Sequence, residues 1–119
     1  SGAIDWWRRF RIGSARIDEI EIYESRGDLP ERIPRHQLAV LGSKSNPKWL
    51  VIECPCGYGH RIDVNLGDAR KARWKLDFEH GNLRPSIDSV RDGRRCHFWI
   101  QDGKVDWCRD STGSRSRLR

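Results

Sequence analysis

The segment CPCGYGH, residues 54–60, contains the side chains whose chemistry is easiest to infer. Two cysteines separated by one proline, with a histidine four positions after the second cysteine, resemble half of a metal site. The proline fixes its own φ and the following glycine lets the backbone fold back closely, so this turn can direct two sulfur atoms at one centre. The remaining ligands must then come from another part of the chain.

A predicted C-terminal hairpin supplies the second half of the site. The segment CHFWIQDGKVDWC contains Asp102-Gly103 between apolar residues, which is a strong hairpin signal, and it has Cys96 and Cys108 at its two ends. Two registers are open. A two-residue turn places His97 opposite Cys108 and leaves the apolar residues on one face, whereas a three-residue loop places Cys96 opposite Cys108.

Zinc suits these ligands, because four thiolates, or three thiolates and one imidazole, form its usual closed tetrahedral shell. The preferred ligand set is Cys54, Cys56, Cys96 and Cys108. In the alternative set, His97 replaces Cys96. A closed shell has no place for water, so the zinc is expected to be structural; a catalytic zinc with Glu53 or Glu79 as base is less favoured because the chain has no H-E-x-x-H motif. Without a metal, the four cysteines would pack as small apolar side chains.

A hydroxyl group near an imidazole would make acyl transfer possible, since serine is a weak nucleophile until a base removes its proton. Ser86 is the candidate nucleophile, because Pro85 stiffens the chain before it and the segment lies between the two cysteine pairs in sequence. His97 and His60 are the candidate bases, and Asp110 is placed to orient a histidine as in a catalytic triad. A serine beside a proline is also common in ordinary turns, so composition and spacing alone leave both interpretations open.

The remainder of the chain predicts a mainly β fold, a small antiparallel β domain with a zinc-stapled terminal hairpin and at most short helices. Apolar or alternating segments bounded by turn formers are predicted as strands. These segments are ARIDEIEIYES, QLAVLG, KWLVIEC and RIDVNL. The segment WKLDFEHGNLRPSI predicts a hairpin that turns at His80-Gly81, and GDARKARW predicts one helical turn with Asp68 as its cap.

The length of 119 residues predicts one domain, with an amphipathic arm at 1–14, a single zinc-stapled β domain at 15–110 and a basic flexible tail at 111–119. Much of the net charge of +6 lies at the two ends, so specific nucleic-acid binding is not expected. No apolar run approaches the roughly 20 residues of a membrane span, and no signal-peptide pattern opens the chain. A cytoplasmic protein with reduced, metal-binding cysteines is therefore expected.

Four segments together resemble an uncharacterised bacterial and phage zinc-binding family. They are CPCGYGHRIDVNL, RWKLDF, LRPSI and CHFWIQDGKVDWC, in this order, and the resemblance covers about residues 50–112. Members of that family are often encoded beside bacterial ubiquitin-like proteins and their activating and conjugating enzymes. The resemblance implies a peptidase, a hydrolase that matures a ubiquitin-like modifier or removes it from conjugates by serine-histidine hydrolysis beside a structural zinc. The implied partner is the ubiquitin-like protein or its conjugates.

The resemblance also assigns positions to the family's C-x-C pair, Pro-Ser segment and Cys-His element. These positions are Cys54, Cys56, Ser86, Cys96 and His97. Many relatives have a further cysteine where this chain has Tyr58, and others lack a cysteine at the position of Cys108. Ser86 and His97 are therefore the more constant pair.

The alternative to an enzyme is a non-catalytic, zinc-stapled module that binds a peptide or a protein. The chain has six tryptophans, most of which are expected in the core. In either hairpin register Trp99 falls on the face opposite to Phe98 and Ile100, where it would line a groove for an extended peptide. Such a module would bind its partner without cleaving it.

Overall fold

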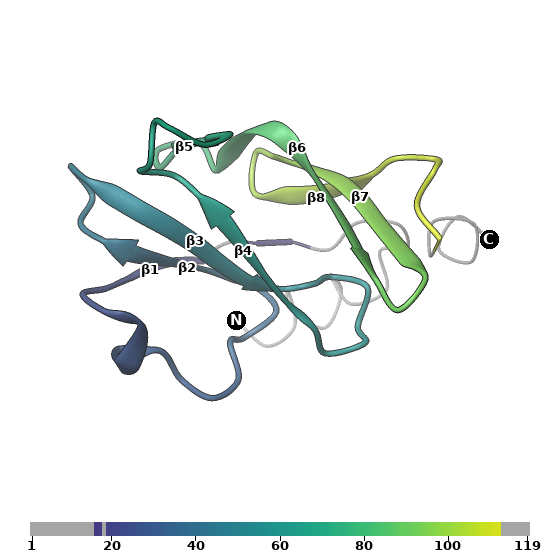
Figure 1. Ribbon diagram of the computed structural model, residues 1–119, viewed down its shortest axis with the longest axis horizontal. Coiled ribbons are helices and arrows are strands. Elements are labelled where there is room, and N and C mark those ends of the chain that lie inside the picture. Colours follow the sequence, from purple (N-terminus) through teal and green to yellow (C-terminus); the bar gives the residue numbers. More distant parts are fainter. Residues whose placement is uncertain (1–15, 18, 113–119) are drawn as a thin grey trace, which may run out of the picture.

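The computed structural model describes residues 16, 17 and 19–112, which form two four-stranded sheets (Figure 1). The first sheet consists, in spatial order, of β1 (Glu19–Tyr23), β2 (Gln37–Gly42), β3 (Pro47–Glu53) and β4 (Arg61–Asn65). The second consists of β5 (Lys75–Asp77), β6 (Asn82–Arg91), β7 (Arg94–Gln101) and β8 (Lys104–Trp107). Among these strands only β1 and β2 pair in parallel, so the predicted mainly β, mostly antiparallel fold is confirmed.

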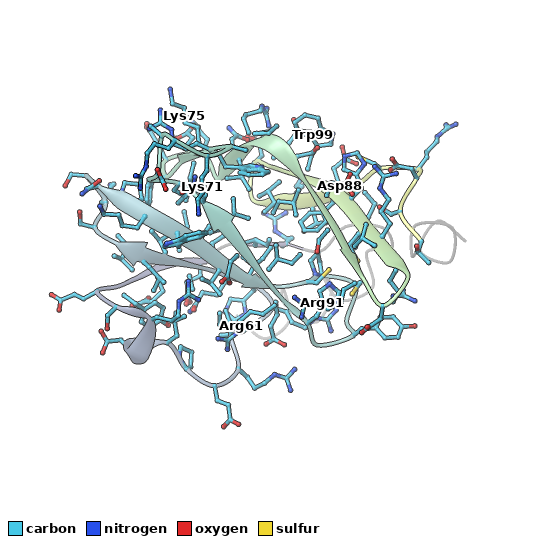
Figure 2. All side chains as sticks on the ribbon, in the orientation of Figure 1. Arg61, Lys71, Lys75, Asp88, Arg91 and Trp99 are labelled. Carbon is cyan, nitrogen blue, oxygen red and sulfur yellow. The ribbon has the colours of Figure 1, made fainter. Side chains whose placement is uncertain are left out.

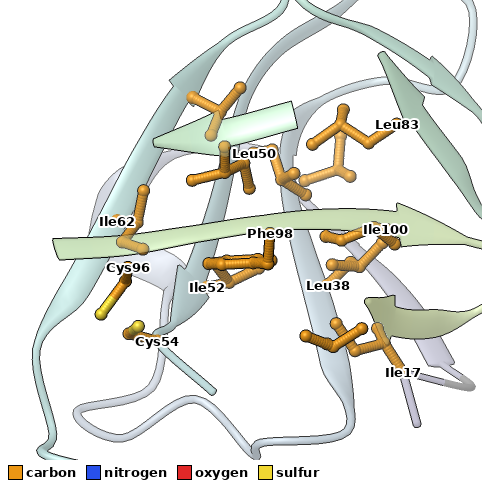
Figure 3. Packing of buried hydrophobic residues seen from close by; sticks show 14 of the residues in the cluster. Ile17, Leu38, Leu50, Ile52, Cys54, Ile62, Leu83, Cys96, Phe98 and Ile100 are labelled. Atoms are coloured by element: carbon orange, nitrogen blue, oxygen red, sulfur yellow. The ribbon is translucent and has the colours of Figure 1, made fainter. Parts of the chain in front are cut away.

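The main core lies between the two sheets. Buried and more exposed side chains alternate along β7, whereas β2 and most of β3 are buried on both faces. The inward-facing side chains of both sheets meet in one apolar cluster. Figure 3 shows Phe98 of β7 beside Ile52 of β3, and both side chains are almost fully buried. Burial of this apolar surface holds the sheets together, and it fixes which residues of β6 and β7 face away from the core.

Two tight turns set the register of the second sheet. Asp92-Gly93 joins β6 to β7 and Asp102-Gly103 joins β7 to β8, and all four residues have φ between 51° and 77°. These values fit two-residue hairpin turns, in which an Asp-Gly pair tolerates the left-handed conformation. Gln101 pairs with Lys104, so the chain adopts the first of the two predicted registers and His97 lies opposite Cys108.

The predicted hairpin around His80-Gly81 is present, as a turn over residues 78–81 between β5 and β6. The helical turn predicted for GDARKARW is wrong, because residues 67–74 form an irregular segment with one turn and two bends. The Asn65 side-chain amide donates hydrogen bonds to the carbonyls of Asp68 and Ala72, which holds the segment in this non-helical path. The described helical residues are confined to η1 (Arg26–Asp28), and no helix in the described part of the chain is long and apolar enough to cross a bilayer.

The predicted arm at 1–14 lies outside the described residues, as does most of the predicted tail. Ser111 and Thr112, at the start of that tail, are described and hydrogen-bond to β7. The chain after β8 therefore folds back along β7 for at least these two residues.

Candidate active site and metal centre

A bulge in β6 positions Ser86. Leu83 pairs with Ile100 and Ile87 pairs with Phe98, so residues 84–86 together stand opposite Trp99. An irregularity of this kind bends a strand and redirects its side chains. Because Ile87 is buried in the core, the neighbouring Ser86 side chain lies on the outer face of the sheet.

His97 reaches the same outer face from β7. Cys96 and Phe98 on either side of it are buried in the core, so alternation along the strand directs the imidazole outward. Its Nε2 atom lies 2.9 Å from Ser86 Oγ, within hydrogen-bond distance. The predicted nucleophile and the predicted base are thus in direct contact.

Asp110 completes a line of three side chains. Its Oδ1 atom lies 2.8 Å from His97 Nδ1, and since a carboxylate can only accept, Nδ1 carries the proton and donates it. Nε2 is then the acceptor for the Ser86 hydroxyl. The imidazole is about one-fifth exposed and the Asp110 side chain about half exposed. This arrangement has the geometry of a Ser-His-Asp triad, which is recognised by contacts and roles rather than by fold.

Two further residues hold the three side chains in place, and neither could be identified from the sequence. Ser111 is buried, and its hydroxyl accepts a hydrogen bond from the His97 N–H (2.8 Å) and donates one to the His97 carbonyl (2.6 Å). Arg95 contacts Asp110 at 3.1 Å and Asp88 at 2.6 Å, and it holds the pKa of Asp88 below its usual range. Both residues fix the loop that carries Asp110 onto the outer face of the sheet.

Trp99 lies on this outer face, as the hairpin pattern predicted. The Arg84 guanidinium lies over its ring, 5.4 Å from the centroid. Trp74 approaches the bulge from the other side and donates an indole N–H to the Ser86 carbonyl at 3.2 Å. The backbone around Ser86 is therefore supported by side chains from both flanks.

A second cluster of side chains lies at the turn between β3 and β4. It consists of Cys54, Cys56, His60 and Cys96, whose ligand atoms all lie within 4.8 Å of one another. Figure 3 shows the Cys54 and Cys96 side chains next to each other at one end of the core. His60 Nδ1 lies 3.8 Å from Cys56 Sγ, close to the separation of about 3.6 Å expected for two ligands of one tetrahedral zinc.

The chemistry of this cluster fits a metal ion. Three thiols and one imidazole form a common structural zinc shell, and Cys54, Cys56 and Cys96 are all buried. Burial raises the pKa of the Cys54 and Cys96 thiols, and burial, followed by the charges of Arg91 and Arg94, lowers the pKa of His60. The imidazole is thus kept in the neutral form that binds metals, whereas the thiols need a cation to stabilise their thiolates.

The family model for bacterial ubiquitination-like system serine proteases, BubE, matches residues 25–108, which is well over half of the chain. The chain belongs to the BubE family. This confirms the resemblance to a family associated with ubiquitin-like conjugation systems, and the family description is that of a serine protease. No curated protein and no solved structure gives a significant match.

The BubE match includes both partners of the Ser86 and His97 hydrogen bond and all four cysteines, whereas Asp110 lies just beyond its end. The structure brings Cys54, Cys56 and Cys96 together, but it places Cys108 in a separate group with His97 and Asp110. It places His60 among the cysteines rather than beside Ser86. Glu53, considered as a base for a catalytic metal, is buried and ion-paired with Arg32 at 2.8 Å.

Proposed function

We propose that this BubE-family protein is a peptidase that trims the C-terminal tail of a ubiquitin-like modifier or removes the modifier from conjugates. The observation that carries this proposal is the continuous hydrogen-bonded line from Ser86 through His97 to Asp110. The family description supports a serine protease in a ubiquitination-like system. The ubiquitin-like substrate is inferred from that description.

In the proposed reaction the Ser86 Oγ atom attacks the scissile carbonyl carbon while its proton passes to His97 Nε2. The tetrahedral intermediate then collapses, and His97 returns the proton to the leaving amine as the C–N bond breaks. Water repeats the sequence on the acyl-enzyme, which releases the carboxylic acid and restores Ser86. Asp110 stays ionised, keeps the imidazole in the required tautomer and stabilises its protonated form.

We assign a structural zinc to Cys54, Cys56, His60 and Cys96. A bound zinc would supply a rigid cross-link between the turn at residues 54–60 and β7, one residue from His97. With four protein ligands its shell is closed, so the hydrolytic steps belong to the chain's own side chains. The ligand set differs from the sequence-based preference by having His60 in the place of Cys108.

The test uses a ubiquitin-like precursor with extra C-terminal residues, taken from the same conjugation system. Intact-mass spectrometry should show loss of the extension with the unaltered protein, and Ser86→Ala should lower the rate by about 10³-fold or more. Ser45→Ala is the matched control, because Ser45 is an exposed serine in the turn between β2 and β3. Binding of the precursor without cleavage would instead support the non-catalytic module, and equal cleavage by Ser86→Ala would remove Ser86 from the mechanism.

A further inference from the structure

The strand that carries Ser86 has one open edge. β5 pairs with β6 only at residues 82–84, and β7 occupies the opposite side of β6. Within the described part of the chain, no strand pairs with residues 85–91 on the side away from β7. A half-open strand therefore begins at the candidate nucleophile and continues to the turn at Asp92 (Figure 1).

The hairpin register determines which main-chain groups face this open edge. Arg91 and Arg94 close the two-residue turn, so they form a hydrogen-bonded pair, and such pairs alternate with non-bonded pairs along an antiparallel ladder. The non-bonded positions of β6 are then Asp88 and Val90. Their N–H and C=O groups point away from β7.

Contacts on the other side of β7 support this assignment independently. His97 is the register partner of Asp88, and its carbonyl accepts from the Cys108 N–H at 2.9 Å on the β8 side. Arg95 is the partner of Val90, and its carbonyl accepts from the Thr112 N–H at 2.8 Å. The main chains of His97 and Arg95 thus face away from β6, as they must if Asp88 and Val90 face its open edge.

The side chains along this edge do little to prevent another strand from pairing with it. Val90 is 68% exposed, and the charge of Asp88 is paired with Arg95. Natural sheet edges that must avoid pairing usually present unpaired charges, prolines or bulges. Here Pro85 and the bulge at residues 84–86 lie at one end of the edge, where Trp74 binds the Ser86 carbonyl, and the stretch from Ile87 to Arg91 is left open.

We propose that this edge binds the C-terminal tail of the ubiquitin-like substrate as an added antiparallel strand, an inference that rests on the proposed function. Because β6 runs away from Ser86, an antiparallel peptide runs toward it. The residues before the scissile bond then pair with Val90 and Asp88, and the scissile carbonyl reaches Ser86. Recognition through main-chain groups requires an extended segment, which a modifier's tail provides and a folded surface does not.

The far end of the open edge is basic. Arg91 lies there, and its guanidinium reaches the Arg61 carbonyl at 3.4 Å, so the two arginines are neighbours (Figure 2). Arg94 lies beyond the turn with its guanidinium over Tyr58. In the proposed direction the folded body of the modifier lies at this end, so an acidic surface next to its tail fits the charge.

The test measures binding by titration calorimetry to Ser86→Ala protein, so that no cleavage occurs. The probe is a peptide of about eight residues from the modifier's C-terminus, enough to span a strand. Val90→Pro removes an N–H that the pairing of β6 with β7 does not use, and it should weaken binding by about tenfold. Val90→Thr keeps the N–H and the branched shape, and it should change binding by less than about threefold.

Peptides methylated at single backbone nitrogens provide a second test that leaves the protein unchanged. Methylation should weaken binding at alternate residues only, because every second N–H of an added strand faces its neighbour. Three results would overturn the proposal. They are an equal loss of affinity on methylation at every residue of the peptide, no binding of the peptide, and a change of oligomeric state in Val90→Pro without loss of peptide binding. If the unaltered protein cleaves the precursor but methylation weakens peptide binding equally at every residue, strand addition is wrong and the proposed peptidase function stands. If methylation weakens binding at alternate residues but no cleavage occurs, the peptidase function is wrong and strand addition stands.

Discussion

At the scale of single residues, the triad depends on three different local devices. A bulge turns Ser86 to the outer face, strand alternation directs His97 to the same face, and the chain after β8 brings Asp110 back to the imidazole. Ser111 and Arg95 then fix the loop and the carboxylate. Residues that act through such short contacts are sensitive to shifts of a fraction of an ångström, so their substitution should affect turnover more than substrate binding.

The proposed role of Asp110 predicts a specific kinetic effect. Asp110→Asn should lower kcat by about 10² to 10⁴-fold with little change in KM, because an amide no longer selects the tautomer that leaves Nε2 free to accept. Steady-state kinetics on the extended precursor measure both constants. Asp106→Asn, an exposed residue of β8, is the matched control and should leave them nearly unchanged. Equal kinetics for the two variants would exclude Asp110 from the triad.

Ser111 predicts a combined effect on stability and turnover. Ser111→Ala removes two hydrogen bonds to the His97 main chain. The His97 carbonyl keeps its bond from the Cys108 N–H, but the His97 N–H loses its acceptor, so the free energy of unfolding should fall by about 1–3 kcal/mol. Urea unfolding measures this change, and kcat should fall with it. Ser45→Ala at an exposed turn should change stability by less than about 0.5 kcal/mol. An unchanged unfolding midpoint for Ser111→Ala would show that the loop is held by other contacts.

At the scale of elements, the hairpin turn decides which sulfur atoms can share an ion. The two-residue turn places Cys108 opposite His97, and therefore on the outer face, whereas Cys96 points into the core toward Cys54. The sequence shows that Cys96 and Cys108 lie at the same end of the hairpin. It does not show whether their side chains point to the same face of the sheet, because that depends on the type of turn. The turn between β3 and β4 brings His60 to the place that Cys108 was expected to fill.

This separation predicts unequal effects of two cysteine substitutions. Cys96→Ser should lower the bound zinc well below one ion per chain, because it removes one of the four proposed ligands. Cys108→Ser should keep one ion per chain, since its sulfur lies in the other group. Metal analysis by mass spectrometry after gel filtration gives the stoichiometry. If Cys108→Ser loses its zinc while His60→Ala keeps it, the ligands are the four cysteines that the sequence analysis preferred.

At the scale of the whole molecule, the strands and the two Asp-Gly turns could be predicted because alternation and turn chemistry are local signals. The bulge at residues 84–86 could not, since it depends on how β6 and β7 both pack against the first sheet. The same limit applies to Ser111, which appears in the sequence as part of a basic, polar tail. Ser86 and His97 were predicted as a pair, but only the packing of the sheets brings them to 2.9 Å.

The buried thiols predict that metal binding is coupled to proton release. Burial raises the pKa of Cys54 and Cys96, so their thiols are protonated without metal, and zinc must displace those protons. Titration calorimetry of the metal-free protein in buffers of different ionisation enthalpy should show release of about one proton per cysteine ligand. Because protons compete with zinc, affinity should fall as the pH falls, and chelation should lower the Tm. Zinc binding without proton release would contradict this ligand chemistry.

The most direct measurement of the central claim is covalent labelling with a fluorophosphonate, which reacts with an activated serine hydroxyl. After digestion, peptide mass spectrometry should locate a single adduct on Ser86, and His97→Ala should reduce it strongly because the base that activates the hydroxyl is gone. Two results would contradict the claim that His97 activates Ser86 for catalysis. One is labelling of Ser86 that does not depend on His97, and the other is an adduct on a different serine in a protein that cleaves its substrate.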